Sequence, residues 1–311
     1  MEEIKHKYVE VNGLKLHVAE IGAGKSTVLF VHGFPEIWYS WRHQMIALAE
    51  AGYRAIAPDF RGYGLSDQPP EPEKASFSDL VGDLLAILDA LGITKVFLVA
   101  KDFGAWPAYL IALMYPGRVS GVITCGVPFV PPGLFAFDKH LPEGFYISRW
   151  REPGRAEADF GRFDAKTVIG NIYILFSRSE IPIAGANQEI MDLVEPSTPP
   201  PPWFTEEDLE NYAALYSKSG IFTALQVPYR SLREKFHPPE MKVEAPALLI
   251  MGEKDYFLKF PGVEDYIRSG QVKAFTPHLE IAYLPEGSHF VQEQSPDQVN
   301  RLILVFLDNH S

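Results

Sequence analysis

Six short apolar runs recur along the chain, and amphipathic stretches separate them. The runs are Thr27–Val31, Arg54–Pro58, Lys95–Ala100, Val119–Cys125, Ala247–Met251 and Leu279–Leu284. Runs that are apolar on both faces are typical of strands in a sheet that helices cover on both sides. The pattern therefore predicts an α/β fold with a mostly parallel central sheet.

Turn and helix signals agree with this prediction. Lys7–Val11 and Leu14–Glu20 flank Asn12-Gly13, a dipeptide that favours a two-residue β-hairpin. Helix starts are predicted at Ser76-x-x-Asp79, Thr205-x-x-Asp208 and Ser295-Pro296. We expect the chain to begin with an antiparallel hairpin and to continue as alternating strands and helices.

The alternation stops between the fourth and the fifth apolar run. This stretch contains two clusters of prolines and several helix-like pieces, but no convincing buried strand. We therefore expect residues 131–240 to form a mainly helical cap domain, inserted into a core domain of residues 1–130 and 241–311. A chain of 311 residues is long enough for a main domain with a second, smaller one.

Charge and composition exclude several kinds of partner. The chain has 40 acidic and 28 basic residues, a formal net charge of −12, and no dense run of Lys or Arg. Nucleic acids and anionic membranes are therefore poor partners. The apolar runs are also far shorter than the roughly 20 residues that a membrane span needs. A homodimer is compatible with the sequence, which leaves the oligomeric state open.

The number and spacing of cysteines and histidines indicate the cellular compartment and whether a metal site is expected. The single cysteine, Cys125, cannot form an internal disulfide, and the opening Met1–Lys7 has no apolar segment of the kind that directs secretion. We expect a cytoplasmic protein. The nine histidines are scattered, and no Gly-x-Gly-x-x-Gly follows a strand, so we expect no metal and no cofactor.

One acidic residue lies between a predicted strand and a predicted helix. Asp102 follows Lys95–Ala100 and precedes the helix expected over Ala105–Met114. Small residues flank it, as a tight strand-to-helix turn requires, and the pattern is typical of a nucleophile elbow. The alternative is that Asp102 merely caps its helix, a common role of aspartate.

Two further residues favour the catalytic interpretation. Asp255 follows Ala247–Met251, and His289 lies in a loop after the last apolar run. A lone loop histidine is usually solvated, and an aspartate at a strand end is usually a turn former. Here, however, nucleophile, acid and histidine follow one another in the order described for hydrolase triads.

A fourth element lies directly after Thr27–Val31, in the segment His32-Gly33-Phe34-Pro35. The backbone N–H groups of Phe34 and Phe103 could hold a developing oxyanion. The alternative is an ordinary turn. We take His32, Pro35 and Phe103 as candidate residues of a substrate pocket.

Together these motifs resemble the soluble epoxide hydrolases of the α/β-hydrolase superfamily, the plant type most closely. The resemblance covers nearly the whole chain. It rests on His32-Gly33-Phe34-Pro35-Glu36, Arg61-Gly62-Tyr63-Gly64-x-Ser66-Asp67, the Asp102 elbow and Gly287-Ser288-His289-Phe290. It implies an α/β-hydrolase fold with an inserted cap and a reaction that converts a small-molecule epoxide and water to a vicinal diol.

The resemblance also assigns roles to residues. It makes Asp102 the nucleophile and His289 with Asp255 the pair that activates water. Two cap tyrosines, Tyr146 and Tyr229, would hold the epoxide oxygen. These residue types suit the reaction, because aspartate is ionised at pH 7 and tyrosine remains protonated as a donor. On sequence alone, either tyrosine is more often a packing residue.

The elbow departs from the family's usual Gly-His-Asp-Trp-Gly. Here it reads Ala100-Lys101-Asp102-Phe103-Gly104, which places a cation beside the nucleophile and reshapes the pocket wall. Substrate range and selectivity therefore stay open. A haloalkane or haloacid dehalogenase would use the same aspartate, but Phe103 has no side-chain N–H for a halide. A ligand receptor without turnover is the other alternative, and the complete set of Asp102, Asp255 and His289 argues against it.

Overall fold

The computed structural model describes residues 3–24, 26–134 and 141–311. Eight strands form one sheet in the order β1-β2-β4-β3-β5-β6-β7-β8. They are β1 (Lys5–Val11), β2 (Leu14–Ile21), β3 (Thr27–Val31), β4 (Arg54–Pro58), β5 (Val96–Lys101), β6 (Val119–Cys125), β7 (Ala247–Gly252) and β8 (Leu279–Leu284). The strands β1, β2 and β4 pair antiparallel, and all other neighbours pair parallel. The predicted mostly parallel sheet is confirmed.

The predicted hairpin joins β1 and β2. Asn12 and Gly13 both have positive φ, 51° and 79°, as the favoured two-residue hairpin turns require. The register pairs Val11 with Leu14 across this turn.

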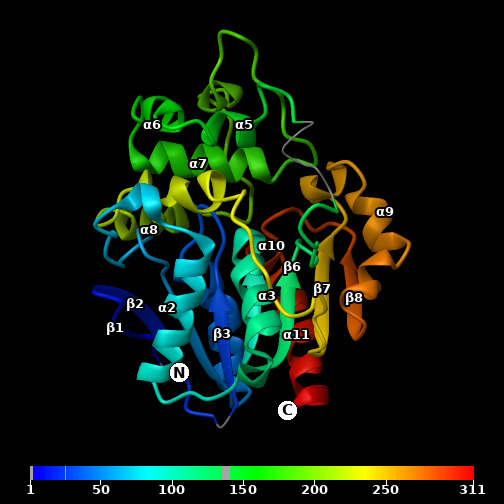
Figure 1. Cartoon of the computed structure of the whole chain (residues 1–311). Helices are drawn as coiled ribbons and strands as arrows, with labels where there is room; N and C mark the ends of the chain where they lie inside the picture. Colours follow the sequence, from blue (N-terminus) through cyan, green and yellow to red (C-terminus); the bar gives the residue numbers. More distant parts are fainter. Residues whose placement is uncertain (1–2, 25, 135–140) are drawn as a thin grey trace.

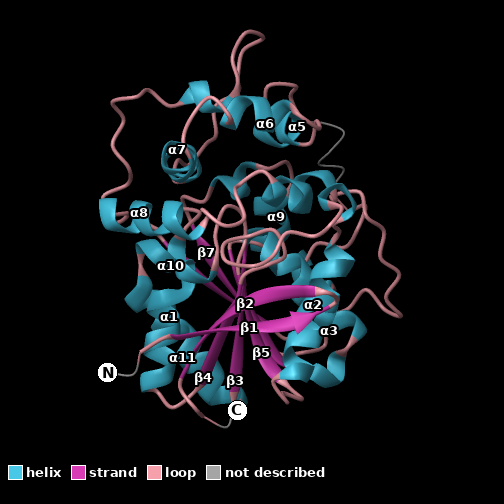
Figure 2. Cartoon of the chain, turned by 90° about the vertical axis from the view of Figure 1, so that its left-hand side faces the viewer, coloured by secondary structure: helices cyan, strands magenta, loops and turns pink. Residues whose placement is uncertain are grey.

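The helices cover both faces of the sheet, as Figures 1 and 2 show. The regular helices are α1 (Arg42–Glu50), α2 (Phe77–Ala90), α3 (Ala105–Met114), α5 (Tyr146–Trp150), α6 (Arg155–Phe160), α7 (Ala165–Phe176), α8 (Glu206–Leu215), α9 (Val263–Arg268), α10 (Val291–Gln294) and α11 (Pro296–His310). Side chains of α2 and α3 pack in one hydrophobic cluster, and those of α1 and α11 pack in another. Alternate residues of β3 belong to the two clusters, since successive side chains of a strand point to opposite faces.

The predicted helix starts are visible in detail. The Ser76 side chain accepts from the Asp79 N–H and the Asp79 side chain accepts in return, a complete capping box for α2. Thr205 and Asp208 form the same arrangement at α8. Pro296 occupies the first turn of α11, but the Ser295 side chain makes no capping bond there.

The chain between β6 and β7 contains helices in its described part and no strand. Figure 1 shows α5, α6 and α7 beyond one end of the sheet. The division into a core and a cap domain with bounds 131 and 240 stays a prediction. Within the described residues, no helix is both long and apolar enough to cross a membrane.

Candidate active site

The turn after β5 holds Asp102 in an unusual backbone conformation. Its φ is 51°, in the left-handed region that costs a non-glycine residue roughly 1–3 kcal/mol. Tight packing surrounds the turn: a Cβ on Gly33 would lie 2.4 Å from the Asp102 Cβ, and one on Gly104 would lie 2.2 Å from the His32 carbonyl oxygen. The small residues therefore let strand, turn and helix α3 meet closely enough to place this carboxylate at the strand end.

Backbone amides hold the Asp102 carboxylate. Its Oδ1 accepts a hydrogen bond of 3.0 Å from the Phe34 N–H. Burial alone would raise the pKa of Asp102, but the hydrogen bond and charge of His289, the charge of Lys101 and the Phe103 amide hold that pKa below its ordinary value. The carboxylate is therefore ionised at neutral pH. The amides of Phe34 and Phe103 both lie beside it, which is where the predicted oxyanion donors need to be.

His289 lies between two carboxylates. Its Nδ1 is 3.0 Å from Asp255 Oδ1, and its Nε2 is 3.3 Å from Asp102 Oδ2. The Phe257 N–H donates a 2.9 Å hydrogen bond to Asp255 Oδ1 and so holds the Asp255 carboxylate in place. Burial and Lys101 lower the pKa of His289, but the two carboxylates raise it by more, and the net direction is upward. The structure thus brings together the three residues that the sequence placed in one triad order.

The two predicted tyrosines lie next to each other, edge to face, and near enough to Asp102 for its charge to act on both hydroxyls. Tyr146 begins α5, Tyr229 lies in the short helix η7 (Gln226–Arg230), and their ring centroids are 6.1 Å apart. Burial and the Asp102 charge raise the pKa of both hydroxyls, so both stay protonated. The Tyr229 ring also packs on Phe34 and Phe103, with centroids 5.1 Å and 5.5 Å away.

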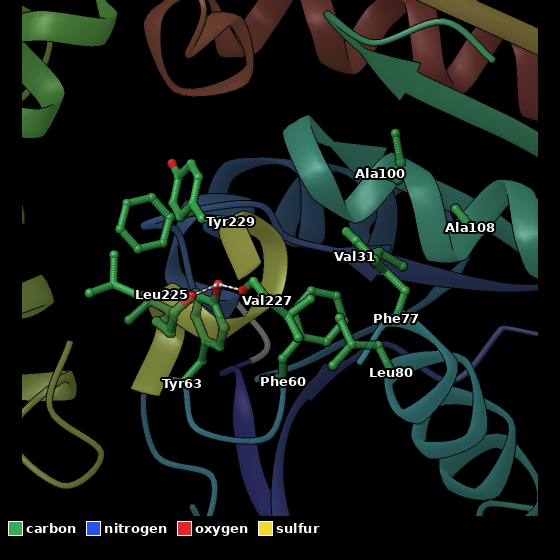
Figure 3. Close-up of a cluster of buried hydrophobic side chains, with 14 of the residues drawn as sticks. Val31, Phe60, Tyr63, Phe77, Leu80, Ala100, Ala108, Leu225, Val227 and Tyr229 are labelled. Atoms are coloured by element: carbon green, nitrogen blue, oxygen red, sulfur yellow. Dashed lines mark hydrogen bonds between the residues drawn. The ribbon is translucent and has the colours of Figure 1, made fainter. Parts of the chain in front are cut away.

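Segment η7 is tied to the core by Tyr63. The Tyr63 hydroxyl donates to the Val227 carbonyl oxygen at 2.6 Å and to that of Ala224 at 2.9 Å. Figure 3 shows Tyr63 and Val227 joined by a dashed line. Next to Tyr229, the Arg230 guanidinium makes two 2.7 Å contacts with the carboxylate of Glu157 on α6. These contacts from both sides position the Tyr229 ring.

The candidate pocket residues His32 and Pro35 lie within the loop after β3. His32 Nε2 accepts from the Phe60 N–H at 3.1 Å, and its Nδ1 is 2.8 Å from the Gly33 carbonyl oxygen. Burial lowers the pKa of His32 to about 4, so the ring is neutral at pH 7. The Pro35 carbonyl accepts a 2.6 Å hydrogen bond from Tyr216. These contacts hold the loop that presents the Phe34 amide.

Sequence reasoning missed Tyr256. Its hydroxyl is 3.1 Å from that of Tyr146, and its ring centroid lies 4.7 Å from that of His289. It therefore contacts both the histidine and one of the two tyrosines. Its position directly after Asp255 was the only signal available from the sequence.

A cavity of about 520 Å³ is lined in part by residues of η7. Its lining includes Tyr229, Arg151, Arg230 and Arg233, but not Asp102, His289 or Asp255. It therefore does not contain the reacting carboxylate.

Comparison with known proteins agrees with this geometry. Residues 26–296 match the family model described as the alpha/beta hydrolase fold. Epoxide hydrolase 1 of Siraitia grosvenorii is 40% identical, with 99% of each chain covered. Epoxide hydrolase A of Mycobacterium tuberculosis is 32% identical, covering 97% of this chain and 96% of the relative.

Solved structures give the same result. A Vigna radiata epoxide hydrolase superposes with a TM-score of 0.90 at 38% identity, covering 99% of both chains. Potato (Solanum tuberosum) epoxide hydrolase I gives a TM-score of 0.88 at 36% identity, covering 99% of this chain and all of that one. The chain therefore belongs to the α/β-hydrolase family and, within it, to the epoxide hydrolases.

Proposed function

We propose that this protein hydrolyses epoxides to vicinal diols through a covalent ester on Asp102. One observation carries the proposal: an ionised aspartate on a strand-to-helix turn lies beside a histidine–aspartate pair and near two protonated tyrosines. A serine nucleophile would need the histidine as its base, whereas an aspartate leaves the histidine free for a second step.

In the first step, Asp102 opens the epoxide. Its Oδ1 is bound to the Phe34 amide, so Oδ2 is the oxygen that attacks an epoxide carbon. The new bond joins Oδ2 to that carbon, the ring C–O bond breaks, and its electrons stay on the epoxide oxygen. Tyr146 and Tyr229 stabilise this oxygen and supply its proton, since both hydroxyls are protonated at pH 7. The product is an alkyl ester.

In the second step, water hydrolyses the ester. The water oxygen adds to the ester carbonyl carbon, and one of its protons goes to His289 Nε2, which Asp255 orients through Nδ1. The carbonyl oxygen becomes an oxyanion against the Phe34 and Phe103 amides. The bond between the carbonyl carbon and the diol oxygen then breaks, and the diol oxygen takes the second proton of the added water. The proton on His289 returns to the tyrosinate left by the first step, so Asp102, His289 and the tyrosines are all restored.

A single turnover in oxygen-18 water, with enzyme in excess, tests the ester directly. If Asp102 attacks first, the diol is unlabelled and the label stays on the peptide that contains Asp102. Direct attack of water on the epoxide predicts labelled diol and an unlabelled peptide. Release of halide from a haloalkane, without diol from an epoxide, would instead favour the dehalogenase alternative.

We further propose that the enzyme works in the cytoplasm on a small-molecule epoxide, without a metal or cofactor. The one cysteine of the chain, Cys125, is buried and unpaired in the described structure, which agrees with a reducing compartment. Residues 131–240 would act as the cap that carries both tyrosines. The proposal includes assembly of the chain into a homodimer. Size-exclusion chromatography with light scattering tests this oligomeric state.

A further inference from the structure

Tyr256 brings a third tyrosine hydroxyl to the reaction site. It is the first residue of the short helix η8 (Tyr256–Lys259), directly after Asp255, and its side chain is buried. Its hydroxyl oxygen is 3.1 Å from that of Tyr146, one of the two tyrosines proposed to hold the epoxide oxygen. This hydroxyl takes no part in the two steps described for Asp102.

The backbone that orients the acid also fixes the Tyr256 ring. Asp255 Oδ1 accepts from the Phe257 N–H, so the backbone on both sides of Tyr256 is tied to the acid. The centroid of the Tyr256 ring is 4.7 Å from that of His289 and 5.4 Å from that of Phe176 on α7. The ring is thus packed between the catalytic histidine and α7, and its hydroxyl is held against that of Tyr146.

The chemistry of ring opening decides which of the two hydroxyls donates. A phenolic hydroxyl carries one proton and can also accept a hydrogen bond. If Tyr146 directs its proton at the epoxide oxygen, its own oxygen can only accept from Tyr256. Once that proton is transferred, the Tyr146 oxygen is negatively charged, and a hydrogen bond to a charged oxygen is stronger than one between neutral groups. The contact therefore strengthens as the proton leaves, which is the condition for lowering the barrier.

The two tyrosines proposed to hold the epoxide oxygen differ in acidity. Burial raises the pKa of Tyr146, and the hydrogen bond with Tyr256 opposes this rise. Burial, Tyr146 and Asp102 all raise the pKa of Tyr229. Of the two hydroxyls, that of Tyr146 is therefore the better proton donor.

We propose that Tyr256 is a positioning residue for ring opening: its hydroxyl donates to the Tyr146 oxygen, so that Tyr146 protonates the epoxide oxygen while Tyr229 only donates a hydrogen bond to it. The O–H bond of Tyr146 breaks as the new O–H bond forms on the epoxide oxygen, and the electron pair stays on Tyr146. Tyr256 keeps its own proton and stabilises this tyrosinate until ester hydrolysis returns the proton. The inference rests on the proposed ester at Asp102.

The first test is Tyr256→Phe, which removes the hydroxyl and keeps the ring that packs on His289. Rapid quench in single turnovers, over a range of enzyme concentrations, gives the maximum rate of ester formation and the half-saturating concentration. We expect the maximum rate to fall about 10- to 100-fold, the usual effect of losing a hydrogen bond to a charged group, at an unchanged half-saturating concentration. Tyr266→Phe is the matched control, because it removes a buried hydroxyl that donates to the Phe129 carbonyl oxygen, and it should keep the wild-type rate.

Double variants show whether Tyr256 acts through Tyr146. In a Tyr229→Phe background, Tyr256→Phe should slow ester formation by the same factor as in the wild type. In a Tyr146→Phe background, it should slow the reaction no further. Equal slowing in both backgrounds overturns the proposal, and so does a wild-type maximum rate in folded Tyr256→Phe. Tyr256→Leu, which also lacks the hydroxyl, takes its place if the Phe variant does not fold.

A spectroscopic readout separates this inference from the proposed function. His289→Gln should accumulate the ester, which intact mass detects, and the ultraviolet difference spectrum between ester and free protein reports the tyrosinate. Adding Tyr256→Phe should raise the pH midpoint of that tyrosinate by about one to two pH units, because the charge loses its hydrogen bond. An ester with an unmoved midpoint overturns only the role of Tyr256. The absence of any ester in folded His289→Gln overturns the proposed function and this inference with it.

Discussion

Replacement of Glu36 by glutamine should stabilise the fold, by an amount that depends on pH. Glu36 is fully buried, and burial raises its pKa from 4.5 to about 7. Each pKa unit corresponds to about 1.4 kcal/mol, so the ionised carboxylate costs the folded state about 3 kcal/mol at pH above 7. This is a substantial part of a typical unfolding free energy of roughly 5–15 kcal/mol.

The sign follows from proton binding. Between pH 4.5 and about 7, the folded protein retains a proton on Glu36 that the unfolded chain has lost, so the stability of the wild type falls as the pH rises. The glutamine side chain of Glu36→Gln resembles the protonated acid and keeps an acceptor for Gln292. The variant should therefore equal the wild type near pH 4.5 and exceed it by about 3 kcal/mol above pH 7.

Urea denaturation at several pH values between 4.5 and 8.5 measures this difference. Glu195→Gln is the control, because Glu195 is exposed and its neutralisation should give no such gain. A Glu36→Gln protein that is no more stable than the wild type at pH 8 would refute the reasoning. So would a gain that is equally large at pH 4.5, since it could not come from the charge.

Other predictions concern the catalytic groups and the contacts of the cap. Tyr146→Phe and Tyr229→Phe should each slow ester formation by roughly 10²-fold or more in rapid-quench assays, and a double variant that reacts at the wild-type rate would leave both tyrosines merely structural. Ester decay should slow as the pH falls through the raised pKa of His289, because only the neutral imidazole accepts a proton, and a pH-independent decay would contradict this role. Asp255→Asn should slow ester decay more than ester formation in the same assay, and equal effects would move the acid role elsewhere. Tyr173→Phe should lower the unfolding free energy by about 1.5–3 kcal/mol in urea, since it removes a 2.8 Å hydrogen bond to the buried Glu293 carboxylate, and no loss would exclude that contribution.

Local chemistry made much of the fold predictable. The apolar runs became strands because a covered sheet needs both faces apolar, and the helix predicted over Ala105–Met114 has those bounds in the structure. Asn12-Gly13 forms its turn because both residues tolerate positive φ. The turn at Asp102 was also predictable from the sequence, since only small neighbours permit the backbone that Asp102 adopts.

Contacts between distant segments could not be predicted from the sequence in this way. The Phe34 amide reaches Asp102 across 68 positions, and Tyr146 meets Tyr256 across 110. Tyr146 and Tyr229 were assigned only through the family resemblance, because a tyrosine that packs and a tyrosine that donates look alike in sequence. Sheet order and the packing of α5 and η7 over the strand ends brought these side chains together.

The sequence by itself determined the elements, the elbow and the order of the three triad candidates, because turn geometry, side-chain size and hydrophobic period act over a few residues. Only the tertiary structure decided which charged groups act on the buried carboxylate of Glu36. The ionisation of Glu36 depends on burial and on charged groups of β5, of the turn after it and of the segment that contains His289 and Glu293. Such long-range electrostatics arise only when the folded chain removes water from between those segments.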